Sequence, residues 1–212
     1  KSSAPDLMEP TAATWLGAPA ERVALGPTPI GLQPTPYIQA RYEGVPYGET
    51  AQVEVRALTD GQAIFIHLTW SDGTDDHQPR GTEGFADGAS LAFPLLGDAP
   101  IITMGSPDAP INAWLWRANQ EGEAGRNVIA SGIGTSFATA PSTVRCKGVL
   151  NEGRWSVVFS RPLSVPEAAG GGVQLGPGAE TKFGVAIWNG SKNERAGIKA
   201  YSEAWHTLKI AG

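Results

Sequence analysis

Cysteine is almost absent from this sequence, and its scarcity excludes several kinds of site. Cys146 is the only cysteine among the 212 residues. A single thiol cannot form an internal disulfide, bind an iron–sulfur cluster through four cysteines, or tether a haem through a Cys-x-x-Cys-His motif. We therefore expect Cys146 to be a small apolar residue of a strand.

Charge is also scarce, and it carries a negative excess. Charged residues make up 17% of the chain, and the formal net charge is −5. Because there is no basic stripe to neutralise phosphates, we expect no nucleic-acid partner. No apolar run approaches the roughly 18 residues that a membrane-spanning helix needs, so we expect no membrane span.

Motifs for hydrolytic and zinc chemistry are missing. The sequence has no Gly-x-Ser-x-Gly motif, and its three histidines, His67, His77 and His206, include no pair at a zinc-binding spacing. We therefore expect no catalytic residues in this chain.

An acidic loop follows one of the expected strands. Its carboxylates belong to Asp72, Asp75, Asp76, Glu83 and Asp87. Paired carboxylates can perform acid–base chemistry or bind calcium, but the spacing matches no EF-hand loop. We favour a solvated turn over a calcium site, and a calcium site over a catalytic one.

Glycine and proline, in contrast, are abundant. The chain has 27 Gly and 17 Pro, spread along it without a period. Such punctuation favours many short strands joined by turns over long helices.

Apolar alternation predicts where the strands lie. In 52–58, apolar residues alternate with Glu54 and Arg56. A turn at 59–61 leads to 63–70, which is apolar on both faces for much of its length, as expected of a central strand. Further strands are expected at 89–94, 113–117, 143–150, 155–161, 182–188 and 204–210. We predict an all-β fold, an antiparallel β-sandwich.

The N-terminal part differs in composition from the rest. Residues 1–48 are rich in proline, which sheets confine to edges and turns. We interpret them as an irregular, extended wrap with short edge strands, belonging to the same single domain as a sandwich over 49–212. A short helical turn is expected near 166–170.

Short motifs follow one another in a distinctive order along nearly the whole chain. They occupy 68–74, 85–89, 93–94, 104–105, 114–118, 153–155 with Arg161, 185–190, 193–199 and 202–205. Their order and spacing resemble the gamma subunits of type II DMSO-reductase-family enzymes. These enzymes include ethylbenzene dehydrogenase, dimethylsulfide dehydrogenase, chlorate reductase and selenate reductase.

The resemblance implies a function for the chain. It implies a sandwich that holds one non-covalent haem b, with a methionine and a lysine as axial ligands of the iron. It also implies a heterotrimer with an alpha subunit carrying a molybdenum cofactor and an iron–sulfur beta subunit. The chain would transfer electrons between the beta subunit and a partner such as a soluble cytochrome c. Since such gamma subunits are exported, we expect a periplasmic protein whose signal was removed before Lys1.

Met104 is the methionine that suits this role. Met8 and Met104 are the only two methionines, and Met104 lies in a loop bounded by Gly and Pro rather than in a core strand, where a gap-filling methionine is expected. A thioether is a soft ligand that raises the potential of haem iron.

Two lysines compete for the opposite ligand position. A lysine can bind metal only as a neutral amine, so it must be desolvated. Lys199, in 196–202, fits the lysine-containing block of the resemblance best, and Lys192 is the alternative. His206 would be the first substitute if neither ligand assignment held.

A secreted carbohydrate-binding β-sandwich module is the alternative function. Seven Trp and four Tyr could supply platforms on which sugars stack. Fold alone does not decide between the two functions.

Overall fold

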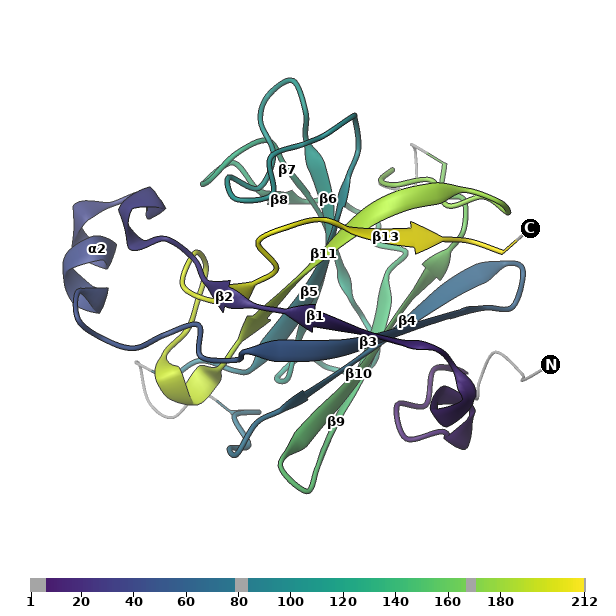
Figure 1. The fold of residues 1–212 in the computed structure, drawn as a ribbon, viewed down its shortest axis with the longest axis horizontal. Helices are drawn as coiled ribbons and strands as arrows, with labels where there is room; N and C mark the ends of the chain where they lie inside the picture. Colours follow the sequence, from purple (N-terminus) through teal and green to yellow (C-terminus); the bar gives the residue numbers. More distant parts are fainter. Residues whose placement is uncertain (1–6, 79–83, 167–170, 212) are drawn as a thin grey trace.

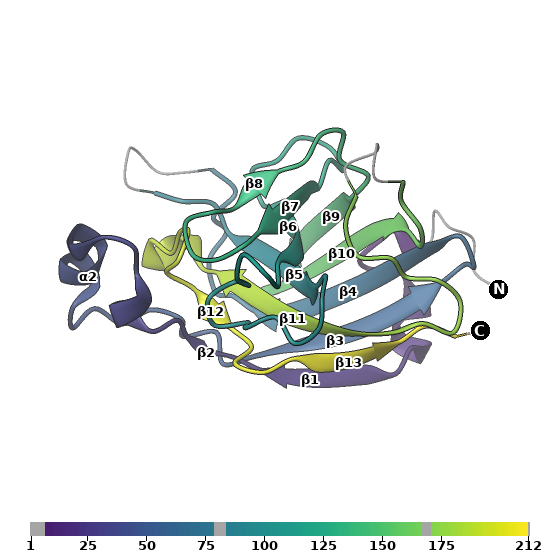
Figure 2. The ribbon, with the colours of Figure 1, turned by 90° about the horizontal axis from the view of Figure 1, so that it is seen from above.

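The chain folds into two antiparallel β-sheets that pack face to face, as Figure 1 and Figure 2 show. The structure is a computed structural model that describes residues 7–78, 84–166 and 171–211. The first sheet has the order β1 (Ala20–Ala24), β3 (Gln52–Thr59), β4 (Ala63–Ser71), β10 (Arg154–Pro162) and β9 (Arg145–Asn151). The predicted antiparallel β-sandwich is confirmed.

The second sheet is larger and uses strands from both ends of the chain. Its order is β2 (Gly26–Pro27), β12 (Ala200–Tyr201), β11 (Glu180–Trp188), β5 (Gly88–Pro94), β6 (Ile111–Arg117), β7 (Arg126–Ala130) and β8 (Phe137–Ala138). A further strand, β13 (His206–Lys209), pairs with β11. The sequence did not predict β7 and β8.

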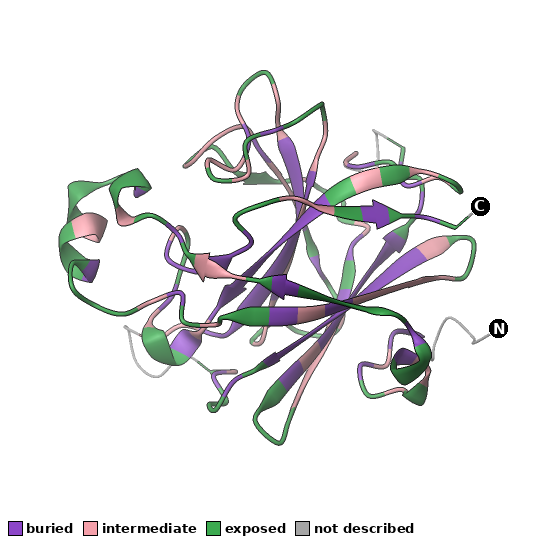
Figure 3. Ribbon diagram, viewed as in Figure 1, coloured by how far each residue is buried: buried purple, intermediate pink, exposed green. Residues whose placement is uncertain are grey.

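The core lies between the sheets and is built by alternation along each strand. Buried residues of β3, β4 and β10 meet those of β5, β6 and β11, and Figure 3 shows buried segments along these central strands. Strand β4 is apolar on both faces because its outward-facing Phe65 packs with Trp15 of the 3-10 helix η1 (Ala13–Gly17). This second contact explains why β4 reads as a central strand.

Two predicted hairpins are present, and glycine provides their turns. Strands β9 and β10 are joined through Glu152 and Gly153, whose φ angles are 49° and 71°. Positive φ at both central residues matches the twist of the flanking strands. Strands β3 and β4 are joined by a turn with Gly61 at φ 90°.

The proline-rich N-terminal part contains a helix that the sequence analysis missed. Helix α2 (Pro36–Tyr42) follows the 3-10 helix η2 (Ile30–Leu32) and lies at one end of the molecule, away from the sheets (Figure 1). Pro36 occupies the first turn, where its missing N–H costs no hydrogen bond, and Thr35 caps the helix by accepting from the Ile38 N–H. Proline here starts an element instead of breaking it.

Two further expectations concern helices. The helical turn expected near 166–170 falls mostly on 167–170, outside the described residues. In the part of the chain that is described, no helix has the length and apolar character needed to cross a membrane.

Candidate functional site

Small side chains gather on part of the outer face of the second sheet. The inner face of β5, β6 and β11 carries large core residues, whereas, beside the larger Leu115, Arg117 and Trp188, several outer positions carry small ones. These are Gly88, Ser90, Ala92, Ala113, Gly184 and Ala186. We call this group the small-residue floor. It allows covering segments to approach closely, since a Cβ added at Gly184 would lie 2.6 Å from Cδ1 of Ile101.

Met104 lies in the loop that covers part of this floor. Its N–H donates to the Ile101 carbonyl (3.0 Å), and the Gly105 N–H donates to the Pro100 carbonyl (2.9 Å). This pair of bonds forms a Schellman-type turn, in which the left-handed position usually belongs to glycine. Met104 occupies that position with φ 59°. A methionine in this conformation costs free energy, which is typical of positions kept for their side chain.

Lys199 approaches Met104 from the segment between the 3-10 helix η4 (Gly190–Lys192) and β12. Its amine donates to the Met104 sulfur, with 3.6 Å between Nζ and Sδ. The amine also lies 5.0 Å from the centre of the Trp188 ring. Lys199 is only 6% exposed, and within the described chain no carboxylate lies at ion-pair distance from it. The structure therefore holds a buried amine beside a thioether.

The surroundings of Lys199 favour its neutral form. Burial, together with the positive charge of Arg117, lowers the pKa of Lys199 to about 8. At pH 7 roughly a tenth of such an amine is neutral, whereas less than about 0.1% of an ordinary lysine is. The Arg117 guanidinium lies over the same ring, with its Cζ 4.8 Å from the Trp188 ring centre. A neutral amine has the lone pair that a metal ligand needs.

Lys192 and the histidines lie elsewhere. Lys192 is half-exposed and forms an ion pair with Glu49 (3.0 Å). His67 stacks on Trp15, His77 packs against Trp155, and His206 contacts Phe183. The structure thus brings together Met104 and Lys199, and neither Lys192 nor a histidine has a recorded contact with that pair.

Buried carboxylates anchor the segment that leads to Lys199. Asp87 accepts from the Gly190 N–H (2.8 Å) and Asp72 accepts from the Asn189 side chain (3.2 Å). Glu194 accepts from the N–H groups of Asn189 (2.9 Å) and Gly48 (2.7 Å). Burial raises the pKa of all three carboxyls, that of Asp87 to about 6. These bonds fix the course of the backbone before Lys199.

The acidic loop is therefore not the solvated turn that the sequence suggested. Asp72, Asp76 and Asp87 are buried, and Asp75 is exposed, while Glu83 lies outside the described residues. Among the residues that are described, no three acidic, histidine or cysteine side chains are arranged to hold a metal ion. Sequence reasoning missed this network because Asp72 and Asp87 each precede a glycine, a pattern that solvated turns share.

Sequence reasoning also missed Trp188, Arg117 and the small-residue floor. The floor had a signal: small residues at every second position of 88–92, in a strand whose other positions are apolar. The signal can be interpreted only when the neighbouring strands are known, because the small-residue floor combines residues of three strands.

The fold and the pair formed by Lys199 and Met104 define a class of protein. It is an antiparallel β-sandwich that buries an amine and a thioether against the outer face of one sheet, outside the core between the sheets. Within that class, the chain belongs to the ethylbenzene dehydrogenase family, whose sequence model matches residues 12–136. The gamma-subunit resemblance to DMSO-reductase-family enzymes is thereby confirmed.

Two relatives extend the match over most of the chain. A protein named as a respiratory nitrate reductase haem subunit, from Haloferax mediterranei, is 32% identical over 202 residues, which cover 93% of this chain and 67% of the relative. The chlorate reductase gamma subunit of Ideonella dechloratans is 34% identical over 212 residues, covering 97% of this chain and 80% of the relative.

Among solved structures, similarity extends to the fold alone. A protein from Bacteroides uniformis, described as carbohydrate-binding, superimposes with a TM-score of 0.52 at 10% identity, covering 95% of this chain and 90% of that one. At such low identity, the likeness identifies a sandwich architecture and no shared ligand.

Proposed function

We propose that this chain is a haem-b electron-transfer subunit of a periplasmic molybdenum oxidoreductase, with Met104 and Lys199 as axial ligands. The observation that carries the proposal is the buried Lys199 amine 3.6 Å from the Met104 sulfur. The relatives named as a haem subunit and as a chlorate reductase gamma subunit support it.

The residues present fit the chemistry of haem ligation. Met104 and Lys199 would hold the haem iron, since a thioether and a neutral amine each offer a lone pair to iron. The structure places the two donors side by side, with 3.6 Å between Sδ and Nζ. The small-residue floor also leaves part of this sheet face without bulky side chains, and a flat macrocycle would lie against that part. The bound haem would supply an iron that gains and loses one electron.

The chain's own side chains would select and tune that group. The Met104 thioether favours the ferrous state and so raises the potential. Burial, with the positive charge of Arg117 nearby, lowers the pKa of Lys199 and so raises its neutral fraction, and the Arg117 charge would also favour reduction of the haem. The Trp188 indole donates to the Ala196 carbonyl (3.0 Å), which holds the Lys199 segment against the sheet and keeps water from the amine.

The burial of the tryptophans argues against the carbohydrate-binding alternative. All seven lie in described segments; six are at most 5% exposed, and Trp205 is half-buried, with its indole donating to Ala99. Sugar platforms need an aromatic face open to solvent, and six of the tryptophans provide none; of the four tyrosines, Tyr37 is 74% exposed, but it lies in α2, away from the sheets. The core and the site use the tryptophans instead.

A visible spectrum tests the proposal. The purified chain, reconstituted with haemin, is expected to show a Soret band and b-type α band, and acidic acetone should extract the haem because no Cys pair tethers it. A protein that stays colourless, or a haem that resists extraction, contradicts the proposal.

Partners and location form a second, separate part of the proposal. We expect the native protein in the periplasmic fraction, copurifying with a molybdenum-containing alpha subunit and an iron–sulfur beta subunit, and exchanging electrons with a soluble cytochrome c. Affinity purification from fractionated cells measures this directly. Recovery from the cytoplasm without partners would contradict this part and leave the haem site untouched.

A further inference from the structure

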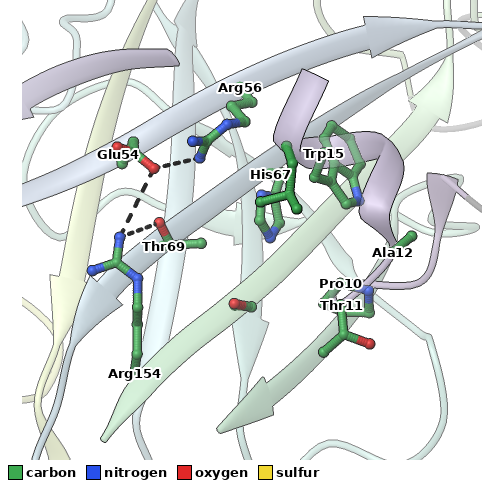
Figure 4. Close-up of a pocket in the computed structure, with 11 residues that line it drawn as sticks. Pro10, Thr11, Ala12, Trp15, Glu54, Arg56, His67, Thr69 and Arg154 are labelled. Atoms are coloured by element: carbon green, nitrogen blue, oxygen red, sulfur yellow. Dashed lines mark hydrogen bonds and ion pairs between the residues drawn. The ribbon is translucent and has the colours of Figure 1, made fainter. Parts of the chain in front are cut away.

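A pocket of about 270 Å³ lies on the opposite face of the sandwich, between the first sheet and the N-terminal segment. Its floor is the outer face of β3, β4 and β10, and its wall is formed by residues 10–16 (Figure 4). We call it the His67 pocket, after the histidine at its centre. It lies across the core from Met104 and Lys199, which belong to the outer face of the other sheet.

His67 is buried in this pocket without a hydrogen bond. It is 4% exposed, and within the described chain neither ring nitrogen meets a partner at full hydrogen-bond geometry, although the Pro10 backbone lies near the ring. Burial, together with the charge of Arg56, lowers the pKa of His67 to about 4, so the ring is neutral. One face of the ring stacks on Trp15, with centroids 4.8 Å apart. A buried polar ring without partners loses free energy unless a ligand or water completes it. A molecule in the pocket that reaches the ring would complete the hydrogen bonding of His67, which the Pro10 backbone meets only in part.

Donors exceed acceptors around His67. Arg56 and Arg154 both turn toward the Glu54 carboxylate: Arg56 pairs with it directly, and Arg154 Nη2 lies 3.9 Å from it while donating to Thr69 (2.6 Å). The Nε of Arg56 is buried and has no partner among the described residues. Two guanidinium groups against one carboxylate leave a net positive charge.

We propose that the His67 pocket binds a small oxyanion, a carboxylate or phosphate group, through Arg56, Arg154 and His67. Guanidinium groups present planar arrays of N–H donors that match such oxygens. A sugar fits less well, because the one indole in the pocket, that of Trp15, is 2% exposed and already stacked on His67. The His67 pocket is separate from the proposed haem site, because the core lies between them. A ligand bound in the pocket would contact the chain on the side of the core opposite Met104 and Lys199.

Calorimetric titration of the full chain, at constant ionic strength, tests this proposal. Sodium phosphate and sodium acetate are titrated separately, and glucose serves as the neutral comparison. We expect binding of one oxyanion per chain with a dissociation constant of about 1 mM or tighter. Shifts of the His67 ring-nitrogen resonances should accompany it in nitrogen NMR. Phosphate alone would indicate a phosphoryl ligand, and acetate alone a carboxylic acid.

Three variants locate the binding. Arg154→Gln should weaken it by about tenfold or more, since a charge-assisted hydrogen bond is lost. His67→Phe keeps the stack on Trp15 and should also weaken binding. Arg41→Gln, the same charge change in α2 at the far end of the molecule, should bind as wild type.

Other outcomes overturn the proposal. Absence of binding to either oxyanion, or binding that Arg154→Gln leaves intact, would remove it. If glucose shifts the His67 resonances and the oxyanions do not, the pocket binds a sugar and the proposed oxyanion ligand is wrong. Because Arg154 is half-exposed, its variant is expected to fold even if Arg56→Gln does not.

Discussion

The side-chain nitrogen of Lys199 lies 3.6 Å from the sulfur of Met104, although the residues are 95 positions apart in the sequence. The amine has been brought there by β12 and the sulfur by the loop after β5, on the same face of one sheet. Neither side chain contributes to the main core between the sheets. The two side chains therefore meet outside the core, and the proposed haem ligation rests on this proximity.

Replacing Met104 separates its ligand role from its backbone conformation. Met104→Ala is expected to fold and bind haem with an altered spectrum and a lower potential, because the soft ligand is lost. Met104→Gly should lose the same ligand. Its free energy of unfolding should nevertheless be about 1 kcal/mol higher than that of Met104→Ala, because glycine adopts φ 59° without strain. Spectroelectrochemistry and urea denaturation measure the two effects. Identical wild-type spectra in both variants would contradict ligation.

Replacing Lys199 should open the other side of the iron. Lys199→Ala is expected to give a five-coordinate or water-bound haem, and Lys199→Arg should fail to restore the spectrum because guanidinium has no lone pair to donate. Lys192→Ala is the control and should be nearly silent, since Lys192 is half-exposed and paired with Glu49. Electron paramagnetic resonance and visible spectra distinguish these states. A low-spin wild-type spectrum in Lys199→Ala would redirect the search to Lys192 and His206.

The buried amine should make the haem-free protein more stable at high pH. The pKa of Lys199 is about 8 when folded and 10.5 in its ordinary state, so between these values the unfolded chain binds more protons. The free energy of unfolding should therefore rise with pH across this window, by up to about 3 kcal/mol. Lys199→Met should lack this rise, whereas Lys192→Met should keep it. Urea denaturation at several pH values gives the free energy of unfolding of each protein. The difference between variant and wild type at each pH removes the contribution of tyrosine titration, which all the proteins share.

A bulky side chain on the small-residue floor should interfere with haem binding. Ala186 is buried on the outer face, opposite Ser90. Ala186→Leu is expected to reduce haem occupancy by displacing the covering segments, and Ala186→Gly, which keeps the floor small, should retain it. Haem per chain and far-ultraviolet circular dichroism report binding and folding separately. Full occupancy in a folded Ala186→Leu protein would show that the floor does not matter.

Loss of a buried anchor should loosen the segment before Lys199. Glu194→Gln places an amide donor opposite one of the two backbone N–H groups that the carboxylate now accepts. The expected cost is about 1–3 kcal/mol of unfolding free energy, with faster loss of haem to apomyoglobin. Glu203→Gln, at an exposed position, serves as the matched control and should change neither quantity. Unchanged haem loss in Glu194→Gln would mean that the anchor has no effect on the site.

Local sequence patterns were sufficient for much of the sandwich. Alternation in 52–58, the apolar run at 63–70 and the glycine turns at 61 and 153 predicted strands and hairpins that the structure contains. These features depend on neighbours within a few residues, because side-chain period and turn conformation are local properties. The same reasoning missed α2 because it treated proline only as a residue that breaks helices. In α2 a proline stands in the first turn and Thr35 caps the helix, so both residues favour its start.

The sequence by itself determined the class of fold, the family and the presence of a methionine in a glycine-flanked loop. Only the tertiary structure decided which lysine meets that methionine. Lys199 and Lys192 are seven positions apart with similar local composition, but β12 pairing buries the first, and the turn at η4 leaves the second in solvent with Glu49. The same holds for the His67 pocket, which joins strands β3, β4 and β10 to residues 10–16. Burial and the loss of solvation depend on contacts between distant parts of the chain, and no local pattern records them.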